Sequence, residues 1–299
     1  MAARLIDADA SSTELLAPFD EQTGFDVAAG RRRLYELRDA ASGDVVGSAV
    51  LGAESLDLDV TPEFRGRGFG RSAAEQLLAR AGDGPLTAWS HENHPAARAL
   101  ANRFGFAATR TLLHLRLDEL RGVDLAAAAG PATIGAFRPG TDDAEWLALN
   151  ARVFAAHPEQ GGVKQSDLDD RMRAPWFRAD DFLVARDDTG RMVGYNWLKA
   201  DGSAARIDSP AGATPPGGGA ARIDETAEIY VIGVAPEASA RGLGRALMTA
   251  GLAHLRERGF RSAELYVEGD NSPAVHLYRS LGFVDESVHV QYSRSFTPR

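Results

Sequence analysis

The chain has 299 residues, of which 44% are hydrophobic and 25% charged, and its formal net charge is −9. Such a length predicts two domains, each with enough apolar material for a core of its own. The negative balance argues against nucleic acid or an anionic membrane as the main partner. The sequence contains no cysteine, which excludes disulfides, thiolate catalysis and cysteine-bound metals.

The first residues lack the apolar core of a signal peptide, and no apolar run approaches the roughly 18 residues that a membrane span requires. We therefore expect a soluble, cytoplasmic protein that binds neither membrane nor nucleic acid. No pattern in the sequence indicates a metal site or self-association, so we expect a metal-free monomer.

Two motifs recur in the same order along the chain. Residues 60–71 (VTPEFRGRGFGR) are similar to residues 234–245 (VAPEASARGLGR), and residues 93–106 (NHPAARALANRFGF) are similar to residues 271–283 (NSPAVHLYRSLGF). Two shared motifs at nearly the same separation predict a duplicated domain. We assign residues 1–122 to the first domain, 123–132 to a linker rich in small residues, and 133–299 to the second domain.

The second half alternates between strand and helix patterns. Strands are expected at 181–186 and 192–198 around a turn at 187–190, then at 228–234 and 263–268. Leucines at helical spacing predict a helix over 242–258 that ends at Gly259. Ser272 and Pro273 suit the N-cap and first position of a short helix whose apolar face carries Val275, Tyr278 and Leu281. The Gly- and Pro-rich residues 201–224 predict a mobile loop.

Each strand that ends in an Arg- and Gly-rich turn before a helix predicts an anion site. Backbone N–H groups at a helix N-terminus are unpaired, the helix dipole favours negative charge, and Arg67, Arg71, Arg241 and Arg245 add positive charge. A dinucleotide is disfavoured because Arg71 and Leu247 occupy the position of the third glycine. A mononucleotide P-loop is disfavoured because neither turn contains Gly-Lys-Ser/Thr.

The two turns resemble the pyrophosphate-binding signature of the GNAT superfamily of N-acetyltransferases, Arg/Gln-x-x-Gly-x-Gly/Ala. Residues 65–70 fit it fully, whereas Ser239 replaces the first residue of the second copy. The superfamily's later pattern, Asn-x-x-Ala and then Tyr-x-x-x-Gly-Phe, is present over 271–283. This resemblance implies an α/β fold of two tandem GNAT-like domains, each a mixed central sheet flanked by helices, and acetyl-CoA as the acetyl donor.

Acetyl transfer to an amine requires a base for the ammonium proton and an acid for the leaving thiolate. Glu228 begins the strand that leads into the second glycine turn and is the candidate base. Tyr278 is the candidate acid, because a phenol with a pKa of about 10 can protonate a thiolate. In the first half, Ala101 or Leu100 takes its place, depending on the direction of counting. The first domain is therefore expected to be non-catalytic.

Within the superfamily, four blocks in order resemble the mycothiol synthases: residues 157–162 (HPEQGG), 196–199 (NWLK), 228–234 (EIYVIGV) and 265–271 (LYVEGDN). That family acetylates the cysteinyl amine of a cysteine–glucosamine–inositol conjugate (Cys-GlcN-Ins) to give mycothiol. The resemblance implies that the substrate is held by Glu159, Lys199, Glu228 and Tyr266. It implies acetyl-CoA contacts from Ile232, Gly233, Val234, Ser239, Ala240, Arg241, Gly242, Leu243, Gly244, Arg245, Asn271, Ser272, Pro273, Ala274, Val275 and His276. A corresponding pocket in the first half would be formed by Leu58, Asp59, Val60, Gly66, Arg67, Gly68, Phe69, Gly70 and Arg71.

Two other functions fit the same motifs. A GNAT enzyme for a peptide N-terminus, an antibiotic or a small amine would keep the roles of Glu228 and Tyr278, but Glu159 and Lys199 would be incidental. A non-catalytic sensor of acyl-CoA would bind the cofactor without turnover. The presence of both a candidate base and a candidate acid disfavours the sensor.

Overall fold

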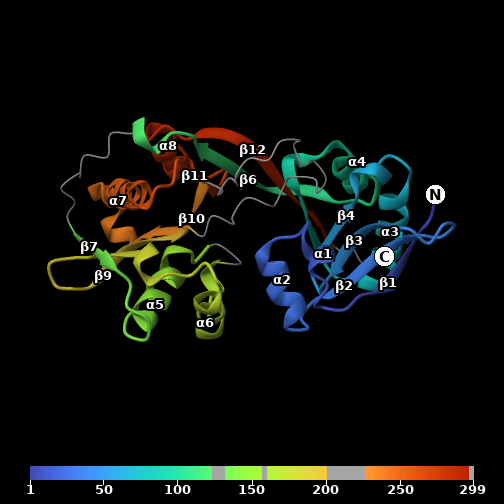
Figure 1. The fold of residues 1–299 in the computed structure, drawn as a ribbon, viewed down its shortest axis with the longest axis horizontal. Helices are drawn as coiled ribbons and strands as arrows, with labels where there is room; N and C mark the ends of the chain where they lie inside the picture. The colour runs from blue at the N-terminus through green and yellow to red at the C-terminus, as the bar shows by residue number, and fades with distance from the viewer. Residues whose placement is uncertain (123–131, 157–159, 201–225, 296–299) are drawn as a thin grey trace, which may run out of the picture.

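The computed structural model describes residues 1–122, 132–156, 160–200 and 226–295 (Figure 1). The predicted loop at 201–224, and all of the predicted linker except Ala132, lie outside these residues. The strands are β1 (Ala3–Asp7), β2 (Arg33–Asp39), β3 (Val45–Leu51), β4 (Leu56–Val60), β5 (Leu86–Ser90), β6 (Ala107–Leu117), β7 (Thr133–Ala136), β8 (Phe182–Arg186), β9 (Met192–Lys199), β10 (Thr226–Val234), β11 (Ser262–Glu268) and β12 (Val284–Arg294). The α-helices are α1 (Thr13–Leu16), α2 (Glu21–Ala28), α3 (Phe69–Ala81), α4 (Pro95–Arg103), α5 (Asp143–Val153), α6 (Gln165–Arg173), α7 (Leu243–Glu257) and α8 (Ser272–Ser280).

These elements form two sheets flanked by helices, as the α/β prediction requires. The smaller sheet has the order β1-β2-β3-β4, and its pairs are antiparallel. The larger sheet has the order β5-β12-β6-β11-β10-β9-β8-β7 and is mixed, because β10 and β11 are parallel. A parallel bridge between Ser55, the residue directly before β4, and Thr87 of β5 joins the two segments.

The two repeats exchange their last strands. β6, from the first repeat, lies between β11 and β12, while β12, from the second, lies between β5 and β6 (Figure 1). The two exchanged strands also pair with each other over most of their length. Side chains of the first repeat are thereby built into the sheet of the second, and the reverse. The boundary predicted near residue 122 separates the two sets of sequence motifs, but the large sheet contains strands from both sides of that boundary.

The local predictions for the second half are largely confirmed. α7 follows the predicted leucine pattern, with Leu247, Leu252 and Leu255 fully buried, and the chain leaves it at Gly259 in the left-handed region, φ +92°. The predicted cap of α8 was one residue late. Asn271 is the N-cap, because its side chain accepts a hydrogen bond from the N–H of Ala274, and Ser272 is the first helical residue.

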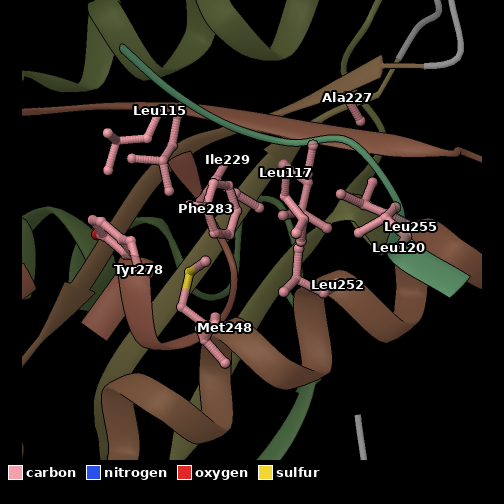
Figure 2. Close-up of a cluster of buried hydrophobic side chains, with 14 of the residues drawn as sticks. Leu115, Leu117, Leu120, Ala227, Ile229, Met248, Leu252, Leu255, Tyr278 and Phe283 are labelled. Atoms are coloured by element: carbon pink, nitrogen blue, oxygen red, sulfur yellow. The ribbon is translucent and has the colours of Figure 1, made fainter. Parts of the chain in front are cut away.

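One face of the large sheet packs against α7 and α8. Ala227 and Ile229 of β10 and Leu115 of β6 point into this core, together with Tyr278 and other side chains (Figure 2). Because side chains alternate along a strand, Glu228 points to the opposite face. The members that Figure 2 labels are Leu115, Leu117, Leu120, Ala227, Ile229, Met248, Leu252, Leu255, Tyr278 and Phe283.

Candidate active site

The large sheet opens between two parallel strands. β10 pairs with β11 over Thr226–Ile229, and within the described part of the chain the ladder does not continue along residues 231–234 on that side. At the same point a bulge interrupts the pairing of β10 with β9, between Ile229 and Val231. A bulge bends its strand away from the ladder. The result is an opening lined by backbone N–H and C=O groups of β10, where Ile232, Gly233 and Val234 lie.

The predicted substrate residues gather on the face of the sheet opposite α7 and α8. Glu228 is in register with Lys199 of β9 and with Glu264 of β11, so the three side chains share this face. Lys199 Nζ lies 5.0 Å from the ring centroid of Trp176, within cation–π distance. Tyr266 lies on the same face, two residues further along β11. Glu159 lies outside the described residues.

Tyr278 lies on the other face. Its side chain is 6% exposed and packs against Phe283, with the ring centroids 6.1 Å apart. Burial raises the pKa of Tyr278 to about 12, because a phenolate is poorly solvated there. Within the described part of the chain its hydroxyl makes no hydrogen bond. The phenol is therefore protonated at neutral pH and has a free proton to donate.

The second glycine turn fits an anion. The 3₁₀ helix η6 (Pro236–Arg241) is followed by Gly242 in the left-handed region, φ +75°. α7 then begins with no side-chain cap and no acidic residue in its first turn, so its N–H groups are available to a ligand. Ser239 donates to the carbonyl of Pro236 at 2.8 Å, which holds the turn despite the departure from the signature.

The first glycine turn has the same construction. The 3₁₀ helix η1 (Pro62–Phe64) precedes Gly66 and Gly68, both at positive φ. α3 also lacks a side-chain cap and an acidic residue in its first turn. Arg65 Nε donates to the carbonyl of Val60 at 2.7 Å, so the signature arginine braces the turn. Leu58, Asp59 and Val60 lie on β4. β4 diverges from β5 after the bridge at Ser55, as β10 diverges from β11 after Ile229.

The remaining predicted cofactor residues lie at helix starts. Phe69 and Leu243 are each 1% exposed and anchor α3 and α7, whereas Arg71 and Arg245 are exposed. Gly70 and Gly244 are the second residues of these helices, and an added Cβ would meet Leu100 at 3.6 Å and Leu277 at 3.5 Å respectively. Residues Asn271, Ser272, Pro273, Ala274, Val275 and His276 form the first turn of α8 and its cap. Arg67 is exposed, and Ala240 and Arg241 belong to the second turn itself.

These contacts decide which residue of the first half corresponds to Tyr278. A Cβ added at Gly70 would meet Leu100, as one added at Gly244 would meet Leu277, so the next residue, Ala101, is the counterpart of Tyr278. The first half therefore has the turn and the opening but no phenol.

Sequence reasoning missed several polar side chains on the face of Glu228. Among them are Glu264 of β11 and His114 of β6, whose imidazole stacks on the ring of Tyr266 with centroids 4.6 Å apart. Sequence offered no signal for His114, because it belongs to the first repeat and reaches this face only through the exchanged strand.

Among the described residues, no helix is both long and apolar enough to cross a membrane. The same residues include no group of three or more His, Asp or Glu side chains placed to hold a metal ion.

Comparison with known proteins agrees with this arrangement. The family model of the acetyltransferase (GNAT) family matches the chain twice, over residues 7–106 and 150–283. A tandem GNAT protein from the clavulanic acid biosynthesis pathway has a similar fold, with a TM-score of 0.66 at 20% identity, covering 99% of each chain.

Closer relatives are found among curated proteins. The mycothiol acetyltransferase of Clavibacter sepedonicus is 42% identical over 287 residues, which cover 94% of this chain and 87% of the relative. That of Acidothermus cellulolyticus is 43% identical over 245 residues, covering 82% and 72%. The chain therefore belongs to the GNAT acetyltransferase family, and within it to the mycothiol acetyltransferases.

Proposed function

We propose that the second half of the chain acetylates the cysteinyl amine of Cys-GlcN-Ins, with acetyl-CoA as donor, to give mycothiol and CoA. Relatives that match over most of this chain are mycothiol acetyltransferases. The proposed acceptor is the amine-bearing conjugate that the sequence motifs imply.

The observation that supports this proposal is that a carboxylate, Glu228, and a phenol, Tyr278, lie on the two faces of the opened sheet. Glu228 lies at the last paired stretch of β10, directly before the opening, and points away from α7 and α8. Tyr278 lies on the helix side. Glu228 would take a proton from the amine on one face, and Tyr278 would give a proton to the departing thiolate on the other. The two side chains would then not compete for the same position.

The proton chemistry follows from the two side chains. An α-amine with a pKa of about 7.7–8.0 is partly neutral at physiological pH, so the base has only to remove one proton. Glu228 accepts that proton, and Tyr278 donates its own to the thiolate. Acetyl-CoA, when bound, supplies an acetyl group activated as a thioester. A positioned acid or base typically contributes about 10²–10⁴-fold.

The chain's own groups fit acetyl-CoA. The uncapped first turn of α7 offers N–H donors to the pyrophosphate, and the unpaired edge of β10 over 232–234 offers backbone donors and acceptors to the amide groups. The start of α8, with Asn271 to His276, would complete the pocket, because α8 lies close to the start of α7: a Cβ added at Gly244 would meet Leu277 at 3.5 Å. The acceptor would lie on the face of Lys199, Glu228 and Tyr266, with Glu159 as a further contact.

The first half would hold a second acyl-CoA without transferring its acyl group. It has the uncapped α3, the glycines and the opening after Ser55, but Ala101 in place of the phenol.

The test is mass-spectrometric detection of the acetylated product from acetyl-CoA and Cys-GlcN-Ins, run beside a panel of peptide, antibiotic and small-molecule amines. A thiol-reactive dye is unsuitable because the acceptor itself carries a thiol. Efficient acetylation of the conjugate alone supports the proposal. Preference for another amine would replace the acceptor, and acetyl-CoA binding without any product would favour the sensor. Glu228→Gln should reduce turnover severely while acetyl-CoA binding stays nearly unchanged.

A further inference from the structure

A second carboxylate lies beside the candidate base on the face of the large sheet that carries Glu228, the acceptor face. Glu264 of β11 and Glu228 of β10 are register partners on neighbouring parallel strands. Because side chains alternate along a strand, both carboxylates project from the same face. Neighbouring strands lie about 4.8 Å apart. Two carboxylates at this separation favour a positively charged hydrogen-bond donor between them.

Only one oxygen of Glu264 is engaged by the protein. Glu264 is buried, with 7% of the residue exposed. His114 Nε2 lies 3.3 Å from Oε2 and donates to it, since a carboxylate can only accept, and Arg116 Nη1 lies 3.9 Å from the same oxygen. Within the described part of the chain, Oε1 has no hydrogen-bonding partner. A buried acceptor left unpaired is costly, so Oε1 is suited to a ligand.

The hydrogen bond from His114 is fixed by contacts on its ring. The imidazole stacks on Tyr266, with the ring centroids 4.6 Å apart and an angle of 10° between the planes. Its Nδ1 lies 3.4 Å from Ser287 Oγ, which donates to it when Nε2 carries the hydrogen of the neutral ring. β6 and β10 flank β11 on opposite sides. His114 therefore holds Oε2 of Glu264 on the β6 side and leaves Oε1 for the β10 side, where Glu228 lies.

The space between Glu228 and Glu264 is closed at one end. Two residues before them, the hydroxyl oxygens of Thr226 and Ser262 lie 2.7 Å apart, and Arg116 Nη2 donates to them at 3.2 Å and 3.3 Å. At the other end, the ladder between β10 and β11 stops one residue after Glu228. A group held between the two carboxylates would therefore lie beside the opening of the sheet, where the thioester of the cofactor is proposed to lie.

The lysine of the acceptor face does not separate the two carboxylates. Lys199 is the register partner of Glu228 on β9, and β9 lies on the side of β10 away from β11. Its Nζ lies 5.0 Å from the ring centroid of Trp176 and 5.8 Å from that of Tyr230. Lys199 therefore flanks Glu228 on one side, and Glu264 flanks it on the other.

We propose that Glu264 binds the ammonium group of the acceptor together with Glu228. This inference rests on the proposed acetyl transfer and adds a residue to its acceptor site. A hydrogen bond from an ammonium to a carboxylate is about 2.7–2.9 Å long. One nitrogen can therefore bridge oxygens up to about 5.6 Å apart, which is more than the strand spacing of about 4.8 Å.

The three N–H groups of the ammonium then have different roles. One is donated to Glu264 Oε1 and another to Glu228. When Glu228 removes its proton, the electron pair of that N–H bond stays on nitrogen. The amine keeps two N–H groups, of which one is still donated to Glu264, so the nitrogen is held beside the opening while it becomes a nucleophile.

Two ligands that differ only in the amine isolate this contact. They are Cys-GlcN-Ins and its deamino analogue, in which hydrogen replaces the cysteinyl amino group. Calorimetric titration of each into the CoA-saturated protein measures affinity without turnover. At pH 7 an amine with a pKa of about 7.7–8.0 is mostly protonated. We expect wild type to bind the conjugate at least about tenfold more tightly than the analogue, because hydrogen bonds between charged groups are strong.

Glu264→Gln keeps the size of the side chain and removes its charge. It should lower the affinity for the conjugate about tenfold and leave the affinities for the deamino analogue and for CoA unchanged. Glu264→Asp, which keeps a carboxylate, should retain part of the preference. Glu268→Gln is the matched control, because Glu268 lies on the same strand and face but is paired with Arg110 Nη2 at 2.5 Å. It should keep the wild-type preference.

Two results would overturn the assignment. Equal weakening of both ligands in Glu264→Gln would mean that the side chain shapes the pocket without binding the amine. Unchanged affinity for the conjugate would mean that there is no contact. Steady-state kinetics should agree, with the KM for the conjugate raised about tenfold and the KM for acetyl-CoA unchanged.

Failure of the proposed function would look different. If wild type binds the conjugate but does not acetylate it, the proposed acceptor is wrong, while the affinities still decide the role of Glu264. If wild type prefers another amine, that amine and its own deamino analogue replace the pair. An equal loss of affinity for these two ligands in Glu264→Gln, or no loss, would again overturn the assignment.

Discussion

Ala101 occupies in the first repeat the position that Tyr278 occupies in the second. The backbone N–H of Phe106 donates to the carbonyl of Ala101 at 2.9 Å, and that of Phe283 donates to the carbonyl of Tyr278 at 3.2 Å. The equivalent ends of α4 and α8 therefore carry a methyl group in the first half, from Ala101, and a phenol in the second, from Tyr278. Since both halves keep the glycine turn, the proposed function implies that the repeats differ in proton donation rather than in their capacity to hold an anion.

Replacing Tyr278 with Phe should separate chemistry from binding. The ring would still pack against Phe283, and the lost hydroxyl makes no hydrogen bond within the described residues, so the free energy of unfolding should change by no more than about 0.5 kcal/mol. We expect kcat to fall by about 10²–10⁴-fold, because the thiolate loses its proton donor. Steady-state kinetics and calorimetric titration with acetyl-CoA measure the two effects.

Tyr292→Phe is the matched control for this variant. Tyr292 is also buried, but its hydroxyl donates to Asn93 Oδ1 at 2.9 Å. Its loss should lower the free energy of unfolding by about 1 kcal/mol with little effect on kcat. Equal turnover by Tyr278→Phe and wild type would remove the acid role from Tyr278.

Valine at Gly68 or Gly242 should disable one cofactor site at a time. Both glycines adopt positive φ, +91° and +75°, which costs a side chain about 1–2 kcal/mol and is worse for a β-branched residue. If each half binds acetyl-CoA, calorimetry should count two sites in wild type and one in each variant. Only Gly242→Val should also lose turnover. Two sites in Gly68→Val would contradict a cofactor site in the first half.

The local structure of the second half could be predicted from sequence because its signals are local. Leucines at helical spacing located α7, and the β-branched run located β10. The cap of α8 was misplaced by one residue, since Asn271 and Ser272 are both good caps. Only the structure shows that the Asn271 side chain reaches the N–H of Ala274.

The strand exchange could not be predicted, and with it a large part of the candidate site. His114 and Glu264 are 150 residues apart, and His91 and His289 are 198 residues apart. Sequence motifs indicate that the domain is repeated, but they do not indicate which repeat supplies the strand beside β11. The polar face of the sheet follows from that pairing rather than from any local pattern.

Removing the Asn271 cap should weaken the helix that carries Tyr278. Asn271→Ala leaves the N–H of Ala274 without its acceptor and should lower the free energy of unfolding by about 1 kcal/mol, while Asn271→Asp should retain most of it. We expect the affinity for acetyl-CoA to fall in the alanine variant, because the first turn of α8 is a proposed contact. Urea denaturation and calorimetry test the two effects. Unchanged stability in Asn271→Ala would contradict the cap.

His289 should make the fold sensitive to mild acid. Its pKa is lowered from 6.5 to about 4 in the folded protein, so the unfolded chain binds the proton first as pH falls. The stability that neutral His289 contributes is complete above pH 6.5 and is lost as pH falls through about 4. Its ring is faced by His91, His114 and Tyr266, and the first two strengthen the effect.

Urea denaturation between pH 7 and about 4.5 measures this contribution. The free energy of unfolding of His289→Gln should be lower at pH 7, where hydrogen bonds to Ser287 and His91 are disturbed, but it should fall less steeply with pH than that of wild type. His276→Gln, at an exposed position on α8, controls for the loss of an imidazole and should keep the wild-type slope. Equal slopes for His289→Gln and wild type would mean that His289 is not held neutral by the fold, and its place between two hydrogen-bonding partners would then need another explanation.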